Sequence, residues 1–199
     1  MGEPRKAIEY YEQALVIDRK IGDRRGEGNA LGNLGVAYRQ LGEPRKAIEY
    51  YEQQLMIVRE IGDQPGEANG LMNTGNAYLD LGEAKQAIEY HEQALQIFRE
   101  ISNRRGEGNA LGNLGSAYNA LGEARKAIEY YEQRLVIARE IGDRRGEGNA
   151  LFNMSLALNN LGEYEKAIAH AEAGLKIFEE IESPHAEKVR HQLAEWKGG

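Results

Sequence analysis

Apolar residues recur along this chain at the spacing of an amphipathic helix. Between residues 4 and 21 they fall three or four positions apart, which places them on one face of a helix. These residues are Ala7, Ile8, Tyr11, Ala14, Leu15 and Ile21. Similar segments follow one another along the rest of the chain, separated by short turns. The hydrophobic pattern therefore predicts an all-α protein.

A helix-breaking residue followed by a capping residue separates these segments. At Gly22-Asp23, glycine suits the left-handed residue after a helix, and aspartate can accept hydrogen bonds from the free N–H groups of the next helix. The equivalent junctions are Gly62-Asp63, Ser102-Asn103, Gly142-Asp143 and Glu182-Ser183-Pro184. In the last junction we expect the serine to be the cap and the proline to take the first helical position.

Another set of segments repeats almost unchanged. The stretch GEGNALGNLGVAY at residues 26–38 returns as GEGNALGNLGSAY at 106–118, and in looser form at 66–78 and 146–158. One asparagine of this stretch recurs every 40 residues, at Asn33, Asn73, Asn113 and Asn153. A fixed period of this length is typical of a stacked-repeat protein, in which each repeat packs only on its neighbours.

We name the helices that carry this stretch type A and those that resemble the first helix type B. Short glycine turns force successive helices to lie antiparallel, so the sequence predicts a single array of A–B hairpins. Its expected parts are an unpaired B helix at 4–21, repeats at 24–61, 64–101, 104–141 and 144–181, and a C-terminal capping helix at 184–197. The capping helix places Ala186, Val189, Leu193 and Trp196 on one apolar face.

The A helices are rich in glycine, which costs up to about 1 kcal/mol per residue relative to alanine. Packing must therefore hold these segments helical. In the first A helix the residues expected to face inward are Leu31, Leu34, Gly35 and Tyr38. We expect the glycines to let the B helix approach closely. An alternative at Gly32 and Gly112 is a site where the backbone of a ligand comes close.

The inward-facing residues resemble the motif of the tetratricopeptide repeat. Leu31, Leu34-Gly35, Tyr38, Ala47 and Tyr51 stand at the spacing of its W-x2-L-G-x2-Y and A-x3-F pattern, with leucine in place of the tryptophan. The resemblance covers essentially the whole chain and implies a right-handed superhelical solenoid of helical hairpins. The period of 40 residues and the phrases LGNLG and AIEYYEQ are most similar to Leu-Gly-Asn spindle-orientation adaptors and bacterial tandem-repeat signalling proteins.

Proteins of this kind hold an extended peptide or a partner segment in an inner, concave groove. The resemblance therefore implies a protein-binding module whose groove is lined by the A helices. This chain departs from the short-repeat pattern, because no proline follows helix B and the usual small residue late in helix B is Gln54 or Arg134 in alternate repeats. Partner identities known for the short-repeat proteins are not expected to apply here.

Two asparagines four residues apart lie on one face of each A helix. The pairs are Asn29 and Asn33, Asn69 and Asn73, Asn109 and Asn113, and Asn149 and Asn153, and the same line continues with Val36, Asn76, Ser116 or Leu156. An amide has both a donor and an acceptor, so it can pair with the main chain of a peptide of any sequence. We expect the pairs to hold the peptide backbone and the third position to select side chains. The alternative is that one asparagine of each pair bonds a neighbouring helix and serves stability alone.

Arginine pairs begin three of the four A helices. They are Arg24 and Arg25, Arg104 and Arg105, and Arg144 and Arg145. Arginine near a helix N-terminus is unfavourable for the helix dipole, so its repetition indicates a rim that recognises an acidic partner. The second repeat has Gln64-Pro65 instead, which interrupts this rim. The alternative is a solvated helix end with no binding role.

Composition narrows the classes of partner. The net charge is -7 and the two signs are interleaved, which argues against a nucleic-acid or anionic-membrane surface. The absence of cysteine excludes disulfides, thiolate metal sites and cysteine nucleophiles. No apolar run approaches the roughly 20 residues of a membrane span, and the first residues lack the plan of a signal peptide. We therefore expect a cytoplasmic setting.

The sequence offers no catalytic or cofactor motif. Its four histidines, at positions 91, 170, 185 and 191, have no repeated ligand spacing, and Gly26-Glu27-Gly28 lacks the preceding strand and the lysine of a phosphate loop. We expect a non-enzymatic protein with no metal or cofactor.

The first helix lacks an A helix of its own, so the face that would meet one should remain apolar and exposed. Either the chain is a fragment of a longer array, or this face mediates self-association, with a homodimer as one result. The near-identical repeats also fit a structural scaffold, natural or consensus-engineered, without a dedicated peptide ligand. Irregularities such as Thr74, His91, Phe98 and Met154 favour a natural sequence.

Overall fold

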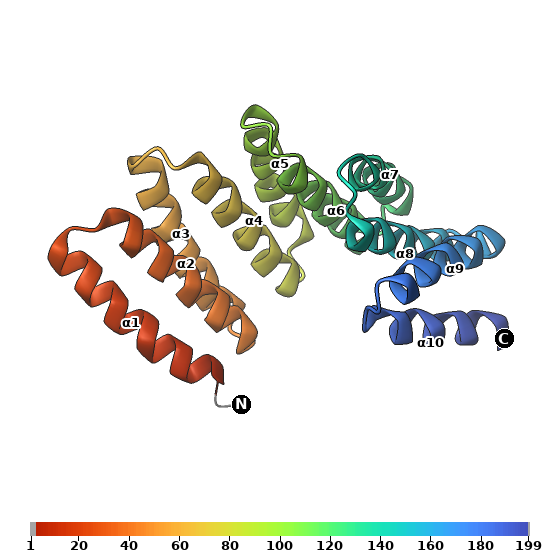
Figure 1. The fold of residues 1–199 in the computed structure, drawn as a ribbon, viewed down its shortest axis with the longest axis horizontal. Coiled ribbons are helices and arrows are strands. Elements are labelled where there is room, and N and C mark those ends of the chain that lie inside the picture. The colour runs from red at the N-terminus through yellow and green to blue at the C-terminus, as the bar shows by residue number, and fades with distance from the viewer. Residues whose placement is uncertain (1–2, 199) are drawn as a thin grey trace. The chain divides into compact units, whose positions relative to one another are not determined.

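The computed structural model describes residues 3–198 and shows ten α-helices there, with no strand among them (Figure 1). The B-type helices are α1 (Glu3–Ile21), α3 (Pro44–Glu60), α5 (Ala84–Glu100), α7 (Ala124–Glu140) and α9 (Tyr164–Glu180). The A-type helices are α2 (Arg24–Gln40), α4 (Gln64–Asp80), α6 (Arg104–Ala120) and α8 (Arg144–Asn160), and α10 (His185–Gly198) follows α9. The predicted all-α class is confirmed.

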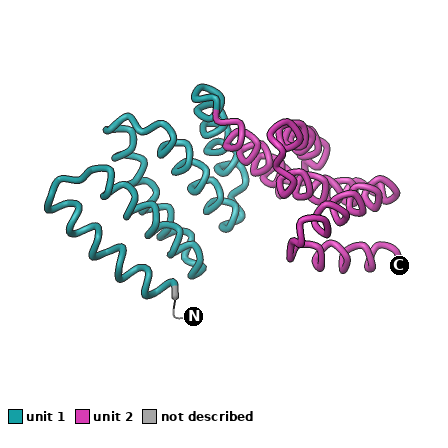
Figure 2. Tube along the Cα trace, in the orientation of Figure 1, with its two compact units in different colours: residues 1–102 teal, residues 103–199 magenta. Residues whose placement is uncertain are grey.

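The helices form two compact units (Figure 2). Unit 1 comprises residues 1–102 and holds α1 to α5, while unit 2 comprises residues 103–199 and holds α6 to α10. Within each unit every helix packs on the next one along the chain. The A helices also touch one another inside a unit, α2 with α4 and α6 with α8. The predicted division into four hairpin repeats stays a prediction.

The turns between helices use the predicted junction residues. Gly22 has a φ of 74° and Gly42 a φ of 78°, the left-handed conformation that glycine adopts most readily. The N–H of Gly26 donates to a carboxylate oxygen of Asp23 at 2.9 Å, and Gly66 donates to Asp63 at 3.0 Å. These hydrogen bonds are the N-caps that the sequence predicts.

Two junctions reach the same turn without glycine. Ser102 and Glu182 have φ values of 54° and 50°. The last helix also begins differently from the expectation, because α10 starts at His185 and Pro184 lies in the turn before it. The hydroxyl of Ser183 accepts from the N–H of His185 at 3.3 Å, so the serine caps the first helical residue.

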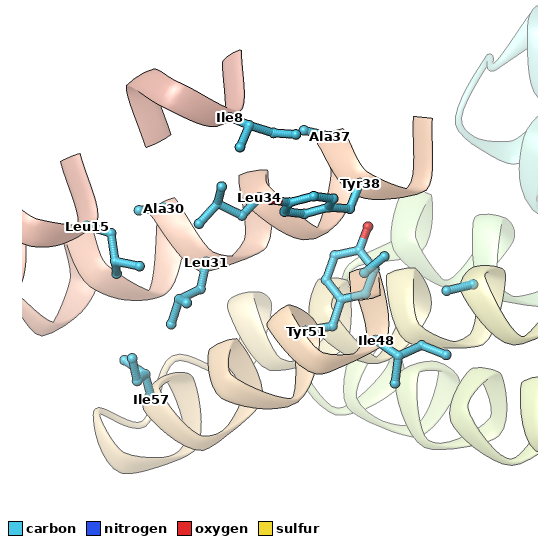
Figure 3. Packing of buried hydrophobic residues seen from close by; sticks show 12 residues of the cluster. Ile8, Leu15, Ala30, Leu31, Leu34, Ala37, Tyr38, Ile48, Tyr51 and Ile57 are labelled. Atoms are coloured by element: carbon cyan, nitrogen blue, oxygen red, sulfur yellow. The ribbon is translucent and has the colours of Figure 1, made fainter. Parts of the chain in front are cut away.

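The core of unit 1 lies between α1, α2 and α3 (Figure 3). Leu31 and Leu34 of α2 are buried there together with Tyr51 of α3, and Ile8 and Leu15 of α1 cover the other side of α2. Burying an aliphatic side chain of this size contributes about 1.5–3 kcal/mol. This packing holds a helix that its glycines alone would not sustain.

A second core lies at the end of unit 2. Phe152 of α8 and Phe178 of α9 pack there against α10. The α10 residues in this cluster are Ala186, Val189 and Leu193, with Trp196 half-buried beside them. The predicted apolar face of the last helix is therefore confirmed, and it covers the side of α9 that would otherwise face water.

Candidate functional site

Glycine on each of three A helices lies against a ring on the B helix that follows. A Cβ on Gly75 of α4 would stand 2.6 Å from Cε1 of His91 on α5. Gly35 meets Tyr51 and Gly115 meets Tyr131 in the same way, each too closely for a side chain on the glycine. The close approach determines which face of these three A helices is buried against the B helix and which face is left open.

A second position between A and B helices is occupied by side chains of complementary size. A Cβ on Gly32 would stand 2.7 Å from the side-chain nitrogen of Gln54, and Arg134 fills the same space over Gly112. In α8 and α9 the sizes are reversed, because Phe152 lies opposite Gly174, and the corresponding residues of α4 and α5 are Met72 and Ala94. The space beside Gly32 and Gly112 is therefore filled, and it does not admit the backbone of a ligand.

The predicted asparagines all lie outside the buried core. Asn29, Asn33, Asn69 and Asn109 are exposed, while Asn73, Asn76, Asn113, Asn149 and Asn153 are half-buried. Except for Asn76 and Asn113, these side chains make no hydrogen bond to any other residue between 3 and 198. Each A helix thus presents a stripe of amides, which we name the asparagine stripe.

The third position of the stripe varies in chemistry. Val36 is exposed, and Asn76, Ser116 and Leu156 are half-buried. The hydroxyl of Ser116 donates to the carbonyl of Gly112 at 3.0 Å and accepts from the hydroxyl of Tyr131 at 3.3 Å. Ser116 is therefore tied to its own hairpin, which the sequence pattern did not indicate.

Neighbouring A helices are joined at one end of the stripe. In unit 1, Arg39 of α2 pairs with Asp80 of α4 at 2.5 Å. In unit 2, the amide of Asn160 on α8 donates to Asn119 on α6 at 3.2 Å. These contacts hold two stripes side by side within each unit.

The rim arginines divide into two kinds. Arg24 pairs with Glu27 of its own helix at 2.5 Å and with Glu60 at the end of α3. Arg104 pairs in the same way with Glu107 and Glu140. Arg144 pairs with Glu147 and Glu180. The second arginines, Arg25, Arg105 and Arg145, are exposed and form no ion pair within the described chain. The first arginine of each pair therefore has a structural role in its own hairpin.

The partner of Arg24 on its own helix is buried. Glu27 accepts a hydrogen bond from Arg19 of α1 at 2.8 Å as well as from Arg24. The bond from Arg19, followed by that from Arg24, holds the pKa of the Glu27 carboxyl below its usual range. This carboxylate links α1 to α2 through two cations.

Arg134 has a different environment from the other arginines that lack an ion pair. Its side chain is half-buried between α6 and α7, and burial lowers the pKa of its guanidinium. Arg134 forms no hydrogen bond or ion pair within residues 3–198. The other arginines without such a bond in this range are all exposed: Arg5, Arg25, Arg45, Arg105, Arg125 and Arg145. A narrow cavity beside it is also lined by Arg105, Asn109 and Asp143. Arg134 therefore lies next to an asparagine of the stripe.

Two further features were not predicted from the sequence. Tyrosines stack between the A and B helices, with the rings of Tyr38 and Tyr50 5.2 Å apart and the ammonium of Lys46 4.0 Å above Tyr38. A groove of about 700 Å³ also lies in unit 1, between α3 and α5. It is lined by Glu49, Glu52, Glu89, Tyr90 and Met56, among others. The repeated AIEYYEQ phrase is the signal that could have indicated both features.

The described residues offer little for metal or acid–base chemistry. No group of three or more histidine, aspartate or glutamate side chains there could hold a metal ion. Both ring nitrogens of His91 are buried without a hydrogen-bond partner, and Nδ1 of His170 bonds only the carbonyl of Lys166 at 2.8 Å. Among the described helices, none combines the length and the apolar character that crossing a membrane requires.

Solved structures share this fold at low sequence identity. BtubC from P. vanneervenii is 23% identical, with a TM-score of 0.81 over 92% of this chain and 76% of that one. A putative kinesin light chain from Podosopora anserina, whose TPR-like repeats are nearly identical to one another, is 22% identical to this chain. Its TM-score is 0.75 over 91% of this chain and 89% of that one. A Rap protein in complex with competence and sporulation factor is 16% identical, with a TM-score of 0.76 over 96% of this chain and 58% of that one.

Sequence comparison identifies the repeat directly. No curated protein matches the chain. The family model described as tetratricopeptide repeat matches residues 1–60, 45–100, 66–140 and 106–180, which together cover most of the sequence. With this match and the shared fold, the chain belongs to the tetratricopeptide repeat family, whose repeats are protein–protein interaction modules.

Proposed function

We propose that the asparagine stripes bind an extended segment of a partner protein. The observation that carries this proposal is that the amides of Asn33, Asn73 and Asn153 form no hydrogen bond to any other residue between 3 and 198. The same holds for the asparagines four residues before them, Asn29, Asn69 and Asn149. Asn29, Asn33 and Asn69 are exposed and Asn73, Asn149 and Asn153 half-buried, so these amides are open to a ligand and no hydrogen bond within the described chain has to break before they bind it. The main chain of an extended peptide offers alternating donors and acceptors, which matches both ends of an amide.

The architectural alternative requires these amides to bond neighbouring helices. Asn160 bonds Asn119 in this way, but both lie beyond the stripe. Asn76 and Asn113 have interactions within the chain, so they support the proposal less than the other members do. The remaining seven stripe asparagines form no hydrogen bond within the part of the chain that the structure describes, which favours the binding role.

The rim arginines extend the proposed site. Arg25, Arg105 and Arg145 are exposed and without an ion pair in the described residues, so they can meet acidic residues that flank the bound segment. Exposed charges of this kind act mainly on the rate of association and weaken with salt. Replacing all three by serine should reduce the salt dependence of binding and leave the helical content unchanged.

We infer that the protein acts by binding and not by catalysis. The likeness to a Rap protein solved with competence and sporulation factor supports a partner-binding fold, and the identity of that partner does not carry over at 16% identity. The net charge of -7 favours a protein partner over a nucleic acid.

A displayed library of disordered peptides tests the proposal. Peptides selected on the unmodified protein are measured against a variant with Asn33, Asn73, Asn113 and Asn153 changed to alanine. We expect affinity to fall at least about tenfold, because several amide hydrogen bonds of roughly 1 kcal/mol each are lost. Helical content is measured by circular dichroism in parallel.

The matched control changes Gln53, Gln93 and Gln133 to alanine. These exposed amides lie on the B helices and bond the carbonyls of Glu49, Glu89 and Glu129 of their own helices. They should leave peptide affinity unchanged. Unaltered affinity in the folded asparagine variant would refute the site. Loss of affinity in the glutamine control would move the binding to the α3–α5 groove, which Gln53 and Gln93 line.

The second candidate is a scaffold without a dedicated ligand that self-associates through α1. The exposure of Tyr10, Ile17 and Ile21 on that helix is the observation in its favour. Light scattering at increasing protein concentration distinguishes the two: a dimer lost on changing Ile17 to lysine supports the scaffold, and a strict monomer removes it.

A further inference from the structure

Three hairpins stack a pair of tyrosines where the A helix ends and the B helix begins. The pairs, whose ring centroids are 5.2–5.3 Å apart, are Tyr38 with Tyr50, Tyr78 with Tyr90, and Tyr118 with Tyr130. In two of them a lysine ammonium lies 4.0 Å from the centroid of the first ring, Lys46 over Tyr38 and Lys126 over Tyr118. The stack is therefore a repeated element of this array.

The last hairpin lacks both rings. At the positions equivalent to Tyr118 and Tyr130 it has Leu158 of α8 and His170 of α9. The equivalent of Lys126 is retained as Lys166, which pairs with the carboxylate of Glu163 at 2.6 Å. This hairpin thus keeps the cation of the stack without the rings.

A pocket of about 330 Å³ lies at this place, between α7, α8 and α9, and we name it the α7–α9 pocket. Its apolar wall consists of Ile128, Met154, Leu158 and Leu161, and its polar lining of Arg125, Glu132, Glu163, Lys166 and His170. The three helices pack in succession within unit 2, with α6 before them and α10 after them. The pocket is therefore formed by the interior of the array and not by an end of the sequence.

The equivalent apolar surface in unit 1 is covered by a ring. Tyr78 and Leu81 pack there against the core cluster that contains Ile48, which is only 8% exposed. In unit 2 the equivalent of Ile48, Ile128, is half-buried. Leu161 is 36% exposed, whereas its equivalent Leu81 is half-buried. Apolar surface is thus left open where a tyrosine ring lies in unit 1.

We propose that the α7–α9 pocket accepts an aromatic side chain from a segment of a partner protein. The incoming ring covers Ile128 and Leu161 and stacks on His170, which stands at the position of the second tyrosine of each pair. Nδ1 of His170 lies 2.8 Å from the carbonyl oxygen of Lys166, and this bond orients the imidazole. The ammonium of Lys166 supplies the cation that Lys126 places over Tyr118. An aliphatic side chain would cover the same wall but would gain neither the stacking nor the attraction of the cation.

The polar lining favours a neutral ring carried on a polypeptide. Arg125 and Lys166 are balanced by Glu132 and Glu163, so the pocket selects neither a free aromatic acid nor a free aromatic amine. The repeats of this family are protein–protein interaction modules, which agrees with a ring presented by a protein. None of the stripe asparagines lines the pocket, so this inference does not depend on the asparagine stripes.

A titration with N-acetyltyrosinamide tests whether the pocket takes a ring. Methyl NMR spectra of the whole protein report Ile128 and Leu161 in the pocket, and Ile48 and Leu81 at the equivalent place in unit 1 serve as an internal reference. We expect saturable shifts at the first two residues and none at the reference pair. Affinity should exceed that for N-acetylleucinamide at least about threefold. No saturable shift at Ile128 and Leu161, or equal affinity for the two amides, would overturn the proposal.

Restoring the tyrosine pair supplies the closed variant. Leu158→Tyr combined with His170→Tyr gives this hairpin the residues of Tyr118 and Tyr130, and it should abolish the saturable shifts at Ile128 while helical content stays unchanged by circular dichroism. Unchanged binding in this folded variant would show that the ring binds elsewhere.

A pair of lysine variants tests the cation without disturbing the packing. Lys166→Gln introduces the residue found at the equivalent Gln86, and it should weaken tyrosinamide binding about threefold. Lys176→Gln is the matched control, since Lys176 is exposed on the same helix and does not line the pocket. Equal effects of the two changes would contradict the role of Lys166.

A displayed library of disordered peptides with one central tyrosine tests the assignment to a protein segment. Peptides are selected on the parent protein in the presence of excess closed variant. They should lose binding when the tyrosine is changed to alanine, and should bind the quadruple asparagine variant as tightly as the parent. Failure to select such peptides, although tyrosinamide binds, would assign the pocket to a free aromatic ligand and overturn the partner segment. Selected peptides that require the asparagines would likewise overturn it as a separate site.

Discussion

The imidazole of His91 on α5 packs directly on Gly75 of α4, in the place where Tyr51 and Tyr131 pack on glycine in other hairpins. The side chain of His91 is fully buried, and neither ring nitrogen has a hydrogen-bond partner. Burial lowers the pKa of His91 from 6.5 to about 4, because the charged form cannot be hydrated there. The folded protein therefore holds this histidine neutral.

Acid should destabilise unit 1 through His91. The unfolded chain takes up a proton near pH 6.5 and the folded protein only near pH 4, so stability is full above pH 6.5 and falls as the pH decreases to 4. At pH 5 the loss amounts to about 2 kcal/mol. Urea unfolding at pH 7 and pH 5 measures it.

The control is His91→Tyr, which restores the residue found at Tyr51 and Tyr131. It should remove most of the pH dependence, because tyrosine does not titrate in this range. Equal losses between pH 7 and pH 5 in both proteins would assign the effect to carboxylates such as Glu27, whose pKa is also lowered.

Two glycines of α2 should respond in opposite ways to alanine. A Cβ on Gly28 would meet Ile57 at 3.4 Å, an ordinary contact, so Gly28→Ala should stabilise the helix by about 1 kcal/mol. A Cβ on Gly35 would overlap the ring of Tyr51, so Gly35→Ala should destabilise by about 2 kcal/mol. Thermal unfolding of the two variants checks this, and a loss of stability in both would mean that the A helices need glycine for another reason.

The difference between these glycines shows the extent of sequence-based prediction in this protein. The junctions at Gly22-Asp23 and its equivalents fixed the helix bounds to within two residues, because capping and left-handed turns depend on local sequence. Helical periodicity likewise placed Asn29 and Asn33 on one face. Which glycine faces a ring depends on contacts between helices, and only the structure shows them.

The rim and the third stripe position illustrate the same limit. Whether Arg24 faces a partner or Glu60 depends on how the end of α3 lies beside the start of α2. Ser116 was expected to select ligand side chains, yet its hydroxyl is shared by Gly112 and Tyr131. Repeat spacing assigns such residues to a helix face but does not determine their hydrogen bonds.

Size compensation between α2 and α3 should be measurable as coupling. Gly32→Met alone clashes with Gln54, and Gln54→Ala alone leaves a void, so each should destabilise by about 1–3 kcal/mol. The double variant reproduces Met72 and Ala94 of α4 and α5, and it should recover at least about 1 kcal/mol of the summed loss. A double-mutant cycle in urea gives the coupling energy, and additive losses would show that the two positions are independent.

Glycine should relieve strain at two turns. Ser102 and Glu182 adopt positive φ, which costs a residue with a side chain about 1 kcal/mol. Ser102→Gly and Glu182→Gly should each raise stability by up to this amount, less the greater freedom that glycine gives the unfolded chain. The reverse change, Gly142→Ser, should lower stability by a similar amount because Gly142 has a φ of 68°. Calorimetric melting measures these changes. Lower stability in the two glycine variants, or higher stability in Gly142→Ser, would contradict the proposed strain.

Removing the charge of Arg134 should stabilise unit 2. Its half-buried guanidinium has no anionic partner among residues 3–198, although the field of Asp143 favours the charged form. Arg134→Gln places the residue of Gln54 in the same setting and should stabilise by about 1 kcal/mol, because a partly desolvated charge is replaced by an amide. Arg105→Gln is the control, since Arg105 is exposed and should change stability little. If Arg134→Gln instead lowers the urea midpoint, the attraction to Asp143 outweighs desolvation, and the guanidinium contributes to the stability of its hairpin.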